Sequence, residues 1–222
     1  IRSRSAWRTL AGVAAVLVLG FAGGLLVPRG STNVEPEMRF ALALPGDWKF
    51  ADADVPLLAI SPDGRRRAVA AVDAAGRRAI LVGEVDKVEW RALGETGSAQ
   101  TPFFSPDGSW IGYFGDGQLR RIAFAGGPSQ ALAKVGNQVR GATWLPDGTI
   151  VYSPDAGEAL WRIGENSGDP QPLTHLRAER EERTHRWPGQ LPGGKAILFT
   201  VDTRKTTEFY YDAETEAVTV TT

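Results

Sequence analysis

The chain has 222 residues, a formal net charge of −1 and no cysteine. This length allows about one globular domain with an appendage. The near-neutral charge does not favour binding to nucleic acid. The lack of cysteine excludes disulfides, zinc–thiolate sites and cysteine nucleophiles.

The first predicted element is a transmembrane helix over residues 9–28. This stretch carries no charged side chain. At about 1.5 Å per residue it would cross the roughly 30 Å hydrocarbon core of a bilayer. The main alternative is a cleaved signal peptide, whose apolar core would be shorter, about 7–15 residues, and would end in a small-residue cleavage site. The run is longer and ends in Leu-Leu-Val-Pro-Arg, so we expect an uncleaved anchor.

The charges around this segment predict its orientation. Arg2, Arg4 and Arg8 precede it, while Glu35 and Glu37 follow soon after it. Because cytoplasmic flanks are rich in Lys and Arg, we expect residues 1–8 to be a cytoplasmic juxtamembrane segment. Residues 29–37 form a polar linker, and the remaining chain, 38–222, would be periplasmic or extracellular. We thus expect a single-pass membrane protein.

Two glycines within the apolar segment could allow two anchors to pair. Gly20 and Gly24 have the GxxxG spacing that lets membrane helices approach closely. Small residues are also common in membrane helices without any such role. Dimerisation through this pair is therefore one of two open interpretations.

A turn motif recurs through residues 38–222. Ser-Pro-Asp-Gly at 61–64 and 105–108 is followed by Leu-Pro-Asp-Gly at 145–148 and Leu-Pro-Gly-Gly at 191–194, and the prolines are 44, 40 and 46 residues apart. Proline fixes φ, aspartate bonds to nearby amides, and glycine accepts positive φ, so each motif predicts a tight turn between two strands. A period of about 40–45 residues is typical of β-propeller blades.

Each period contains four strand-like runs, which predicts four four-stranded blades at about 56–95, 100–135, 139–175 and 184–222. A β-sandwich is the alternative all-β fold, but it predicts no superperiod. The fold class is therefore an all-β β-propeller preceded by one transmembrane α-helix. Residues 38–44 read as an extra strand that could close the ring. We expect the chain to be a segment of a longer propeller protein.

The search for chemistry yields no candidate catalytic, cofactor-binding or metal-ligating set. His175 and His185 lack further ligands at convergent spacing, so structural hydrogen bonding is expected. His185-Arg186-Trp187 has Trp where a kinase catalytic loop has Asp, so these residues contain no kinase domain. Ser129 lies in a near-match to a nucleophile elbow, but at the entry to a strand rather than before a helix.

Three other residue groups receive structural interpretations. The turn aspartates Asp63, Asp107 and Asp147 could form a ring of cation ligands, but their turn-forming role already explains them. Residues 177–186 are dense in charges of both signs, which indicates a solvated loop or, less favourably, a partner-binding edge. Aromatic residues are expected to fill the space between blades, and these include Trp110, Trp144 and Phe199.

The repeats resemble the TolB-like, WD-type propeller repeats of bacterial proteins. FFSPDGSWIGYF at 103–114 and GATWLPDGTIVY at 141–152 carry the likeness, together with residues 185–200. The fourth turn departs from it, because it lacks the Asp. The order of membrane span, linker and propeller is similar to the C-terminal half of bacterial transmembrane serine/threonine protein kinases. That resemblance implies a sensor or interaction module outside the cytoplasm.

Three functions follow as hypotheses. The first is a membrane-anchored propeller that binds a protein, peptide or envelope ligand with loops on one face, and that signals through its anchor helix. The second is the substrate-gating propeller of a prolyl-oligopeptidase-like serine hydrolase, which would need an α/β-hydrolase segment beyond these residues. The third is a TolB-like envelope scaffold with no enzyme attached.

Overall fold

The structure is a computed structural model, and it describes residues 43–51, 55–94, 96–166, 168–203, 209–212 and 217–221. The chain divides into two compact units, Ile1–Leu42 and Ala43–Thr222. The described residues all belong to the second unit. The predicted segments 1–8, 9–28 and 29–37 lie outside them, as does most of the predicted strand 38–44, of which Ala43 and Leu44 have no regular structure.

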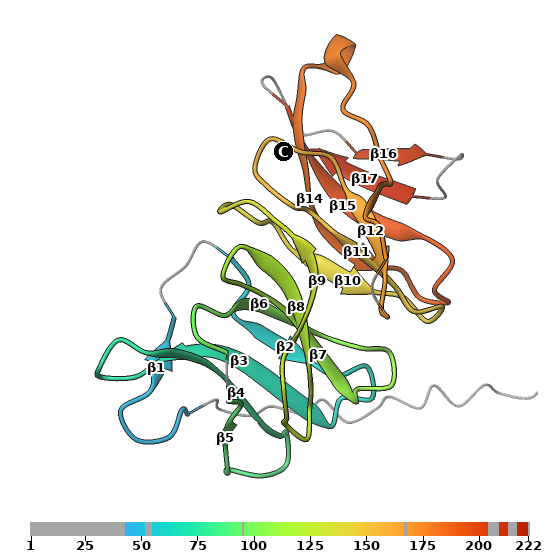
Figure 1. The fold of residues 1–222 in the computed structure, drawn as a ribbon. Coiled ribbons are helices and arrows are strands. Elements are labelled where there is room, and N and C mark those ends of the chain that lie inside the picture. Colours follow the sequence, from blue (N-terminus) through green and yellow to red (C-terminus); the bar gives the residue numbers. More distant parts are fainter. Residues whose placement is uncertain are drawn as a thin grey trace, which may run out of the picture. The chain divides into compact units, whose positions relative to one another are not determined.

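The described residues form four sheets, one for each predicted repeat (Figure 1). The first contains β1 (Lys49–Phe50), β2 (Leu58–Ile60), β3 (Arg66–Val72), β4 (Arg78–Glu84) and β5 (Arg91–Ala92). The second contains β6 (Gln100–Phe104), β7 (Trp110–Gly115), β8 (Gln118–Ala123) and β9 (Gln130–Lys134). The third contains β10 (Ala142–Trp144), β11 (Thr149–Tyr152), β12 (Trp161–Gly164) and β13 (Gln171–Pro172). In the second and third sheets every neighbouring pair is antiparallel, in chain order.

The strands of the fourth sheet do not follow chain order as those of the second and third sheets do. It contains β14 (Glu182–Gln190), β15 (Ile197–Thr203), β16 (Phe209–Asp212) and β17 (Ala217–Thr221), in the order β14-β15-β17-β16. Strand β17 pairs with β15 in parallel, and β16 lies outermost. The sequence between β15 and β16 has no Gly or Pro to specify a tight hairpin. The turn chemistry therefore does not fix which strand of the β16–β17 hairpin adjoins β15.

A hydrogen-bonded turn closes the first hairpin of each sheet. In the second sheet the Ser105 carbonyl accepts from Gly108 N–H (2.9 Å), and Ser105 N–H donates to the Trp110 carbonyl (3.0 Å). Ser105 Oγ donates to Asp107 Oδ1 (2.6 Å) and accepts from Trp110 N–H (2.9 Å). Gly108 has φ +68°, which glycine adopts without strain. Each residue type of the motif thus has a defined role.

The four turns use these contacts to different degrees. The first, with Ser61 and Asp63, repeats the serine–aspartate bond at 2.5 Å. The third keeps the backbone bonds, but Asp147 accepts only from Thr149 N–H (2.9 Å), because Leu145 has no hydroxyl. The fourth keeps the backbone bond from Gly194 N–H to Leu191 (3.0 Å) without an aspartate. The degraded motifs therefore preserve the turn, while the third keeps one side-chain bond and the fourth has no aspartate to form one.

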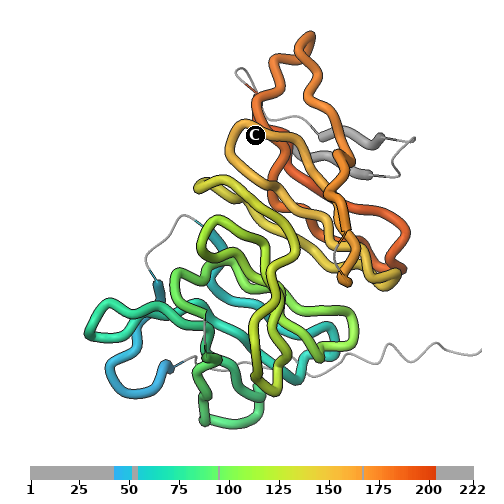
Figure 2. Tube along the Cα trace, viewed as in Figure 1, coloured from blue at the N-terminus to red at the C-terminus, as the bar shows by residue number. Residues whose placement is uncertain are grey.

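Apolar clusters fill the space between successive sheets, which lie side by side along the chain (Figure 2). Side chains alternate between the two faces of a strand, so adjacent residues serve different clusters. Phe104 packs toward the first sheet, and Phe103 packs toward the third. Tyr152 likewise packs against the second sheet, while Val151 packs against the fourth. The second and third sheets are therefore buried on both faces.

The charge-dense segment 177–186 is not the solvated loop that its composition indicates. A short 3₁₀ helix, η1 (Ala178–Arg180), precedes β14, which begins at Glu182. Glu182, Thr184 and His185 are buried. The exposed residues of this segment are Ala178, Glu179, Arg180 and Arg183. The prediction of a solvated loop failed because a charged residue can be buried when it has hydrogen-bond or ion-pair partners. The composition of the segment does not reveal those partners.

We predict that Asp107 contributes stability that acid removes. The hydroxyls of Ser105 and Ser109, with Ser109 N–H, lower the pKa of Asp107 from 3.8 to about 2. The stability is therefore present above about pH 4 and is lost as the pH falls through about 2. In urea titrations from pH 7 to pH 2, D107N should be less stable than the parent chain at pH 7 and equal to it near pH 2. D147N, which loses one contact, should show a smaller difference. An equal effect of both substitutions would contradict this ranking.

Candidate functional site

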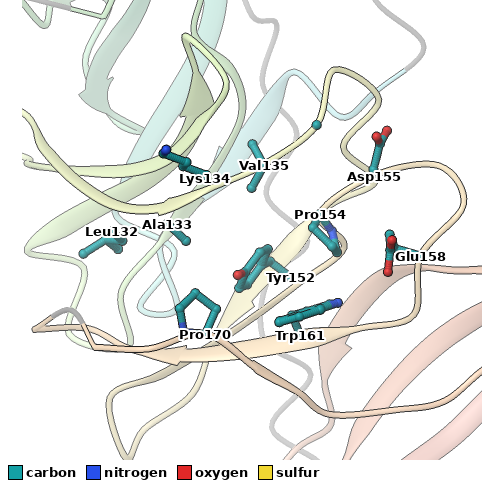
Figure 3. Close-up of a pocket in the computed structure, with 11 residues that line it drawn as sticks. Leu132, Ala133, Lys134, Val135, Tyr152, Pro154, Asp155, Glu158, Trp161 and Pro170 are labelled. Carbon is teal, nitrogen blue, oxygen red and sulfur yellow. The ribbon is translucent and has the colours of Figure 1, made fainter.

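A pocket of about 580 Å³ lies between the second and third sheets. Its volume falls within the roughly 300–1,000 Å³ of small-ligand pockets. Strands β9, β11 and β12 and their adjoining loops form its walls (Figure 3). The lining is mainly apolar and aromatic, with three charged residues: Leu132, Ala133, Lys134, Val135, Gly136, Tyr152, Pro154, Asp155, Glu158, Trp161 and Pro170.

The two aromatic rings of the pocket come from neighbouring strands. Tyr152 is the last residue of β11 and Trp161 is the first residue of β12, and the two pair in register. Residues that pair across antiparallel strands project from the same face of the sheet. This face looks toward β9, whose Leu132 belongs to the same apolar cluster as Tyr152. Ordinary strand pairing therefore places both rings in the pocket wall.

The loop that follows Tyr152 is held by the end of the second sheet. Gly136 N–H donates to the Pro154 carbonyl (2.9 Å), and Asp155 Oδ1 accepts from Gln138 N–H (3.1 Å) and from Ala156 N–H (2.8 Å). A side chain at position 136 would collide with the Asp155 carboxylate. Asp155 is thus engaged in holding the loop, and Gly136 is needed for the close approach.

The fourth sheet holds the same loop from the other side. The Glu158 carbonyl accepts from His185 N–H (3.0 Å) and from Thr184 Oγ1 (3.1 Å). The pocket wall is therefore fixed by bonds to the sheets on both sides of it, and the pocket is formed before any ligand arrives.

The polar groups of the pocket are few. Burial raises the pKa of Tyr152 to about 12, so its phenol is neutral at physiological pH. The phenol hydroxyl is available as a hydrogen-bond donor and acceptor. Lys134 and Glu158 are exposed and place one charge of each sign at the pocket. The site can therefore pack against an apolar or aromatic group of a ligand and form a hydrogen bond with a polar atom of the same ligand.

Two other pockets are lined by turn residues. One, of about 390 Å³, lies between the second and third turn motifs and includes Asp107 and Asp147. The other, of about 470 Å³, lies between residues 45–48 and Asp73 with its neighbours. Asp73, Asp107 and Asp147 already accept hydrogen bonds within their own turns. The pocket beside Tyr152 is the more apolar of the three and is the candidate site.

The turn role predicted for the three aspartates is confirmed. Asp63 accepts from Arg65 N–H (3.0 Å), Asp107 from Ser109 N–H (3.0 Å) and Asp147 from Thr149 N–H (2.9 Å). Within the described ranges, no group of three or more His, Cys, Asp or Glu residues is arranged to hold a metal ion.

The structural role predicted for His185 is also confirmed. Thr174 Oγ1 accepts from Leu160 N–H (2.9 Å) and lies 2.7 Å from His185 Nδ1, to which it donates when the neutral ring carries its proton on Nε2. His185 Nε2 then donates to Glu182 Oε2 (3.3 Å), and Glu182 in turn pairs with Arg177 (3.0 Å). His175, by contrast, is exposed. The structure separates the roles of the two histidines, which the sequence alone did not.

This hydroxyl–imidazole–carboxylate arrangement resembles a catalytic triad in composition only. His185 is 2% exposed, Thr174 is 8% exposed, and the hydroxyl is already bonded on both sides. A substrate could not reach a nucleophile in this position. The cluster holds the fourth sheet against the third.

The remaining candidates have structural roles. Ser129 precedes β9 and contacts the Tyr113 hydroxyl (2.5 Å) and Arg120 Nε (2.9 Å). Trp144 and Phe199 are buried between sheets, as predicted. Trp110 is only half-buried, with the Arg121 guanidinium over its ring at 4.6 Å.

Sequence reasoning did not identify the pocket. Tyr152 and Trp161 had the residue types and strand positions of ordinary core aromatics, and they are indeed packed in the core cluster. A position-by-position comparison of the repeats could have found it. Pro170 precedes Gln171 in the third repeat, whereas the polar Ser129 precedes Gln130 in the second.

Comparisons with known proteins concern the fold. No protein-family model matches the chain, and no curated protein matches its sequence. Among solved structures it is similar to TolB from Agrobacterium tumefaciens, with 18% identity and a TM-score of 0.60 over 73% of this chain and 63% of that one. TolB from Acinetobacter baumannii has 16% identity and a TM-score of 0.48 over 71% and 38%. The propeller domain of the trilobed protease from Pyrococcus furiosus has 14% identity and a TM-score of 0.40 over 52% and 42%.

The Agrobacterium structure establishes the architecture. The chain has an all-β, TolB-like β-propeller fold, as its repeats predict. It spans 63% of the length of that protein. The helix predicted at 9–28 lies outside the described residues, and no helix found among the described residues is long and apolar enough to cross a membrane.

We predict that His185 makes the stability of the chain depend on pH near neutrality. Burial lowers the pKa of His185 below 6.5, against the opposing effect of Glu182. As the pH falls, His185 is therefore protonated at a higher pH in the unfolded chain than in the folded one. The stability that His185 contributes is present above about pH 6.5 and is lost as the pH falls below it. Urea titrations should show a lower free energy of unfolding at pH 5.5 than at pH 7.5. This difference should be smaller in H185Q.

The matched control for this measurement is H175Q. Because His175 is exposed, this substitution should leave the loss of stability between pH 7.5 and 5.5 unchanged. The interpretation is wrong if H185Q retains the full loss, or if H175Q removes it.

Proposed function

We propose that this chain is a protein-interaction propeller that binds a protein or peptide ligand in the pocket beside Tyr152. The observation that carries the proposal is the pocket itself. It is lined by aromatic and proline rings, and hydrogen bonds from two neighbouring sheets hold its wall in place. A site that is ordered before binding loses less conformational entropy when the ligand arrives.

Binding rather than catalysis is favoured by the chemistry of the pocket. Its hydroxyl belongs to a phenol whose pKa is raised to about 12, which is the opposite of an activated nucleophile. Asp155 is occupied by backbone amides. Aromatic rings with one or two hydrogen-bonding groups are typical of interaction sites.

We further propose that the propeller is held at a membrane by residues 9–28 and lies on its extracytoplasmic side. The uncharged segment and the arginines before it support this orientation. The order of span, linker and propeller resembles that of transmembrane serine/threonine kinases, so the chain would be the sensor part of such a protein. Ligand binding would then bias the association or orientation of the anchor helix, with Gly20 and Gly24 as its contact.

Site-specific photo-crosslinking tests the interaction. With p-benzoylphenylalanine at position 161 in living cells, a discrete protein adduct should form on irradiation, because the ring stands in the pocket wall. Position 88 is the control, since Val88 is 86% exposed and does not line the pocket. The absence of an adduct at 161, or the same adduct at 88, would refute binding in this pocket.

Reporter fusions test the membrane placement. Alkaline phosphatase fused after residue 222 should be active in intact cells, and a green fluorescent protein fused there should remain dark if the propeller is exported. Replacing Val16 and Leu17 with arginines should release the protein from the membrane fraction, since each charge at the centre of a span costs about 2.5–3.5 kcal/mol. A fluorescent fusion and an inactive phosphatase would place the propeller in the cytoplasm.

A further inference from the structure

Tyr152 has a counterpart in the second sheet. Tyr113 pairs with Arg120 across β7 and β8, as Tyr152 pairs with Trp161 across β11 and β12. The two tyrosines therefore occupy one position in two successive repeats. Trp161 occupies the position that Arg120 has in the second sheet.

The outer strands supply a second correspondence. Gln130 begins β9 and Gln171 begins β13, and each pairs with an arginine of the strand before it. The residues that precede these glutamines are Ser129 and Pro170. Pro170 therefore stands at the position that Ser129 has in the second sheet.

In the second sheet this position closes a polar network. The Tyr113 hydroxyl lies 2.5 Å from Ser129 Oγ, which also accepts from Arg120 Nε at 2.9 Å. The phenol is thereby satisfied within the protein.

In the third sheet the same network is missing. Proline has no side-chain polar atom, and Trp161 replaces the arginine. The Tyr152 side chain as a whole is 1% exposed, but its hydroxyl is not fully enclosed and is hydrogen bonded to no other residue that the structure describes. Figure 3 shows this hydroxyl directed toward Ala133 and Pro170, and the indole nitrogen of Trp161 at the opposite end of the two rings. The hydroxyl therefore opens into the pocket, where it can donate a hydrogen bond to a ligand.

We propose that this pocket binds a proline-rich segment of a partner protein in the polyproline II conformation. The inference rests on the proposed function, because it names the ligand of the same site. The Tyr152 hydroxyl would donate to a backbone carbonyl of the peptide. The rings of Tyr152 and Trp161, with Pro154 and Pro170, would contact its prolines.

The hydrogen-bonding balance of the pocket favours proline over other residues. Polyproline II carbonyls make no internal hydrogen bonds and remain free to accept. Proline also brings no N–H, whereas other peptides would bury donors among apolar side chains. Aromatic-lined grooves recognise proline-rich segments, because the polyproline II conformation of the segment is already ordered before it binds.

Charge favours a basic residue at one end of this segment. Asp155 is occupied by the loop backbone, but the exposed Glu158 carboxylate forms no ion pair with any residue in the described part of the chain. Glu158 lies on the side of the pocket where Figure 3 places the indole nitrogen of Trp161. An arginine next to the prolines would complement it there.

Fluorescence anisotropy with a labelled peptide tests the inference. The probe is eight prolines followed by one arginine, and its control has alternating alanine and glycine in place of proline. The full 222-residue chain in detergent micelles should bind the proline peptide at least about tenfold more tightly than the control peptide. W161A should weaken binding by about tenfold or more, as loss of an aromatic anchor does. Y152F should weaken it about 3- to 10-fold, as loss of one hydrogen bond does.

Pro170→Ser is the sharper variant, because it gives Tyr152 the partner that Ser129 gives Tyr113. It should also weaken binding about 3- to 10-fold, while leaving the thermal unfolding temperature equal or higher. Y113F is the matched control: it removes a satisfied hydroxyl bond in the second sheet, so it should lower the unfolding temperature without changing affinity.

The outcomes separate this inference from the proposed function. Equal binding of both peptides, lost in W161A, would overturn the preference for proline and leave the pocket as a binding site. Wild-type affinity in both Y152F and P170S would overturn the role of the hydroxyl. A partner crosslinked at position 161 through a segment without proline would also overturn the inference while supporting the proposed function.

Discussion

The hydrogen-bonded turn of the repeat sets the register on which the rest of the structure depends. Ser105 bonds through its amide, carbonyl and hydroxyl to three residues of its own hairpin. A slip of one residue would turn every side chain of a strand to the opposite face. Because the second and third sheets have apolar clusters on both faces, neither face could accept such a change. The turn therefore decides which residues meet between sheets.

Repetition separates what the fold requires from what it allows. Most positions that face the intersheet clusters are apolar, because each cluster needs apolar side chains from two sheets. The side chains around the hydroxyls of the two equivalent tyrosines have more freedom. There Tyr113, Arg120 and Ser129 form a polar network, while Tyr152, Trp161 and Pro170 form the wall of a pocket. The same backbone pairing supports both arrangements.

The sequence predicted the parts of the structure that local chemistry determines. The turn motifs, the strands beside them and the propeller class followed from residue types and their spacing. The parallel pairing of β17 with β15 did not, because residues 203–208 contain no turn signal. Burial of His185 and Glu182 was also not predictable, since their partners Thr174 and Arg177 become neighbours through the fold. The membrane segment has only its sequence as support.

The pocket could not be recognised from residue type, because a tyrosine in a strand is usually a core residue whose hydroxyl finds a partner. What distinguishes Tyr152 is the loss of a partner that its counterpart has. A repeat protein contains its own reference for such comparisons, since equivalent positions share one backbone geometry and differ only in side chains. Where one repeat bonds a hydroxyl within the protein and the next leaves it open to a pocket, the shared backbone geometry is not the reason for the difference. The open Tyr152 hydroxyl then supports a ligand from outside the chain as its hydrogen-bond partner.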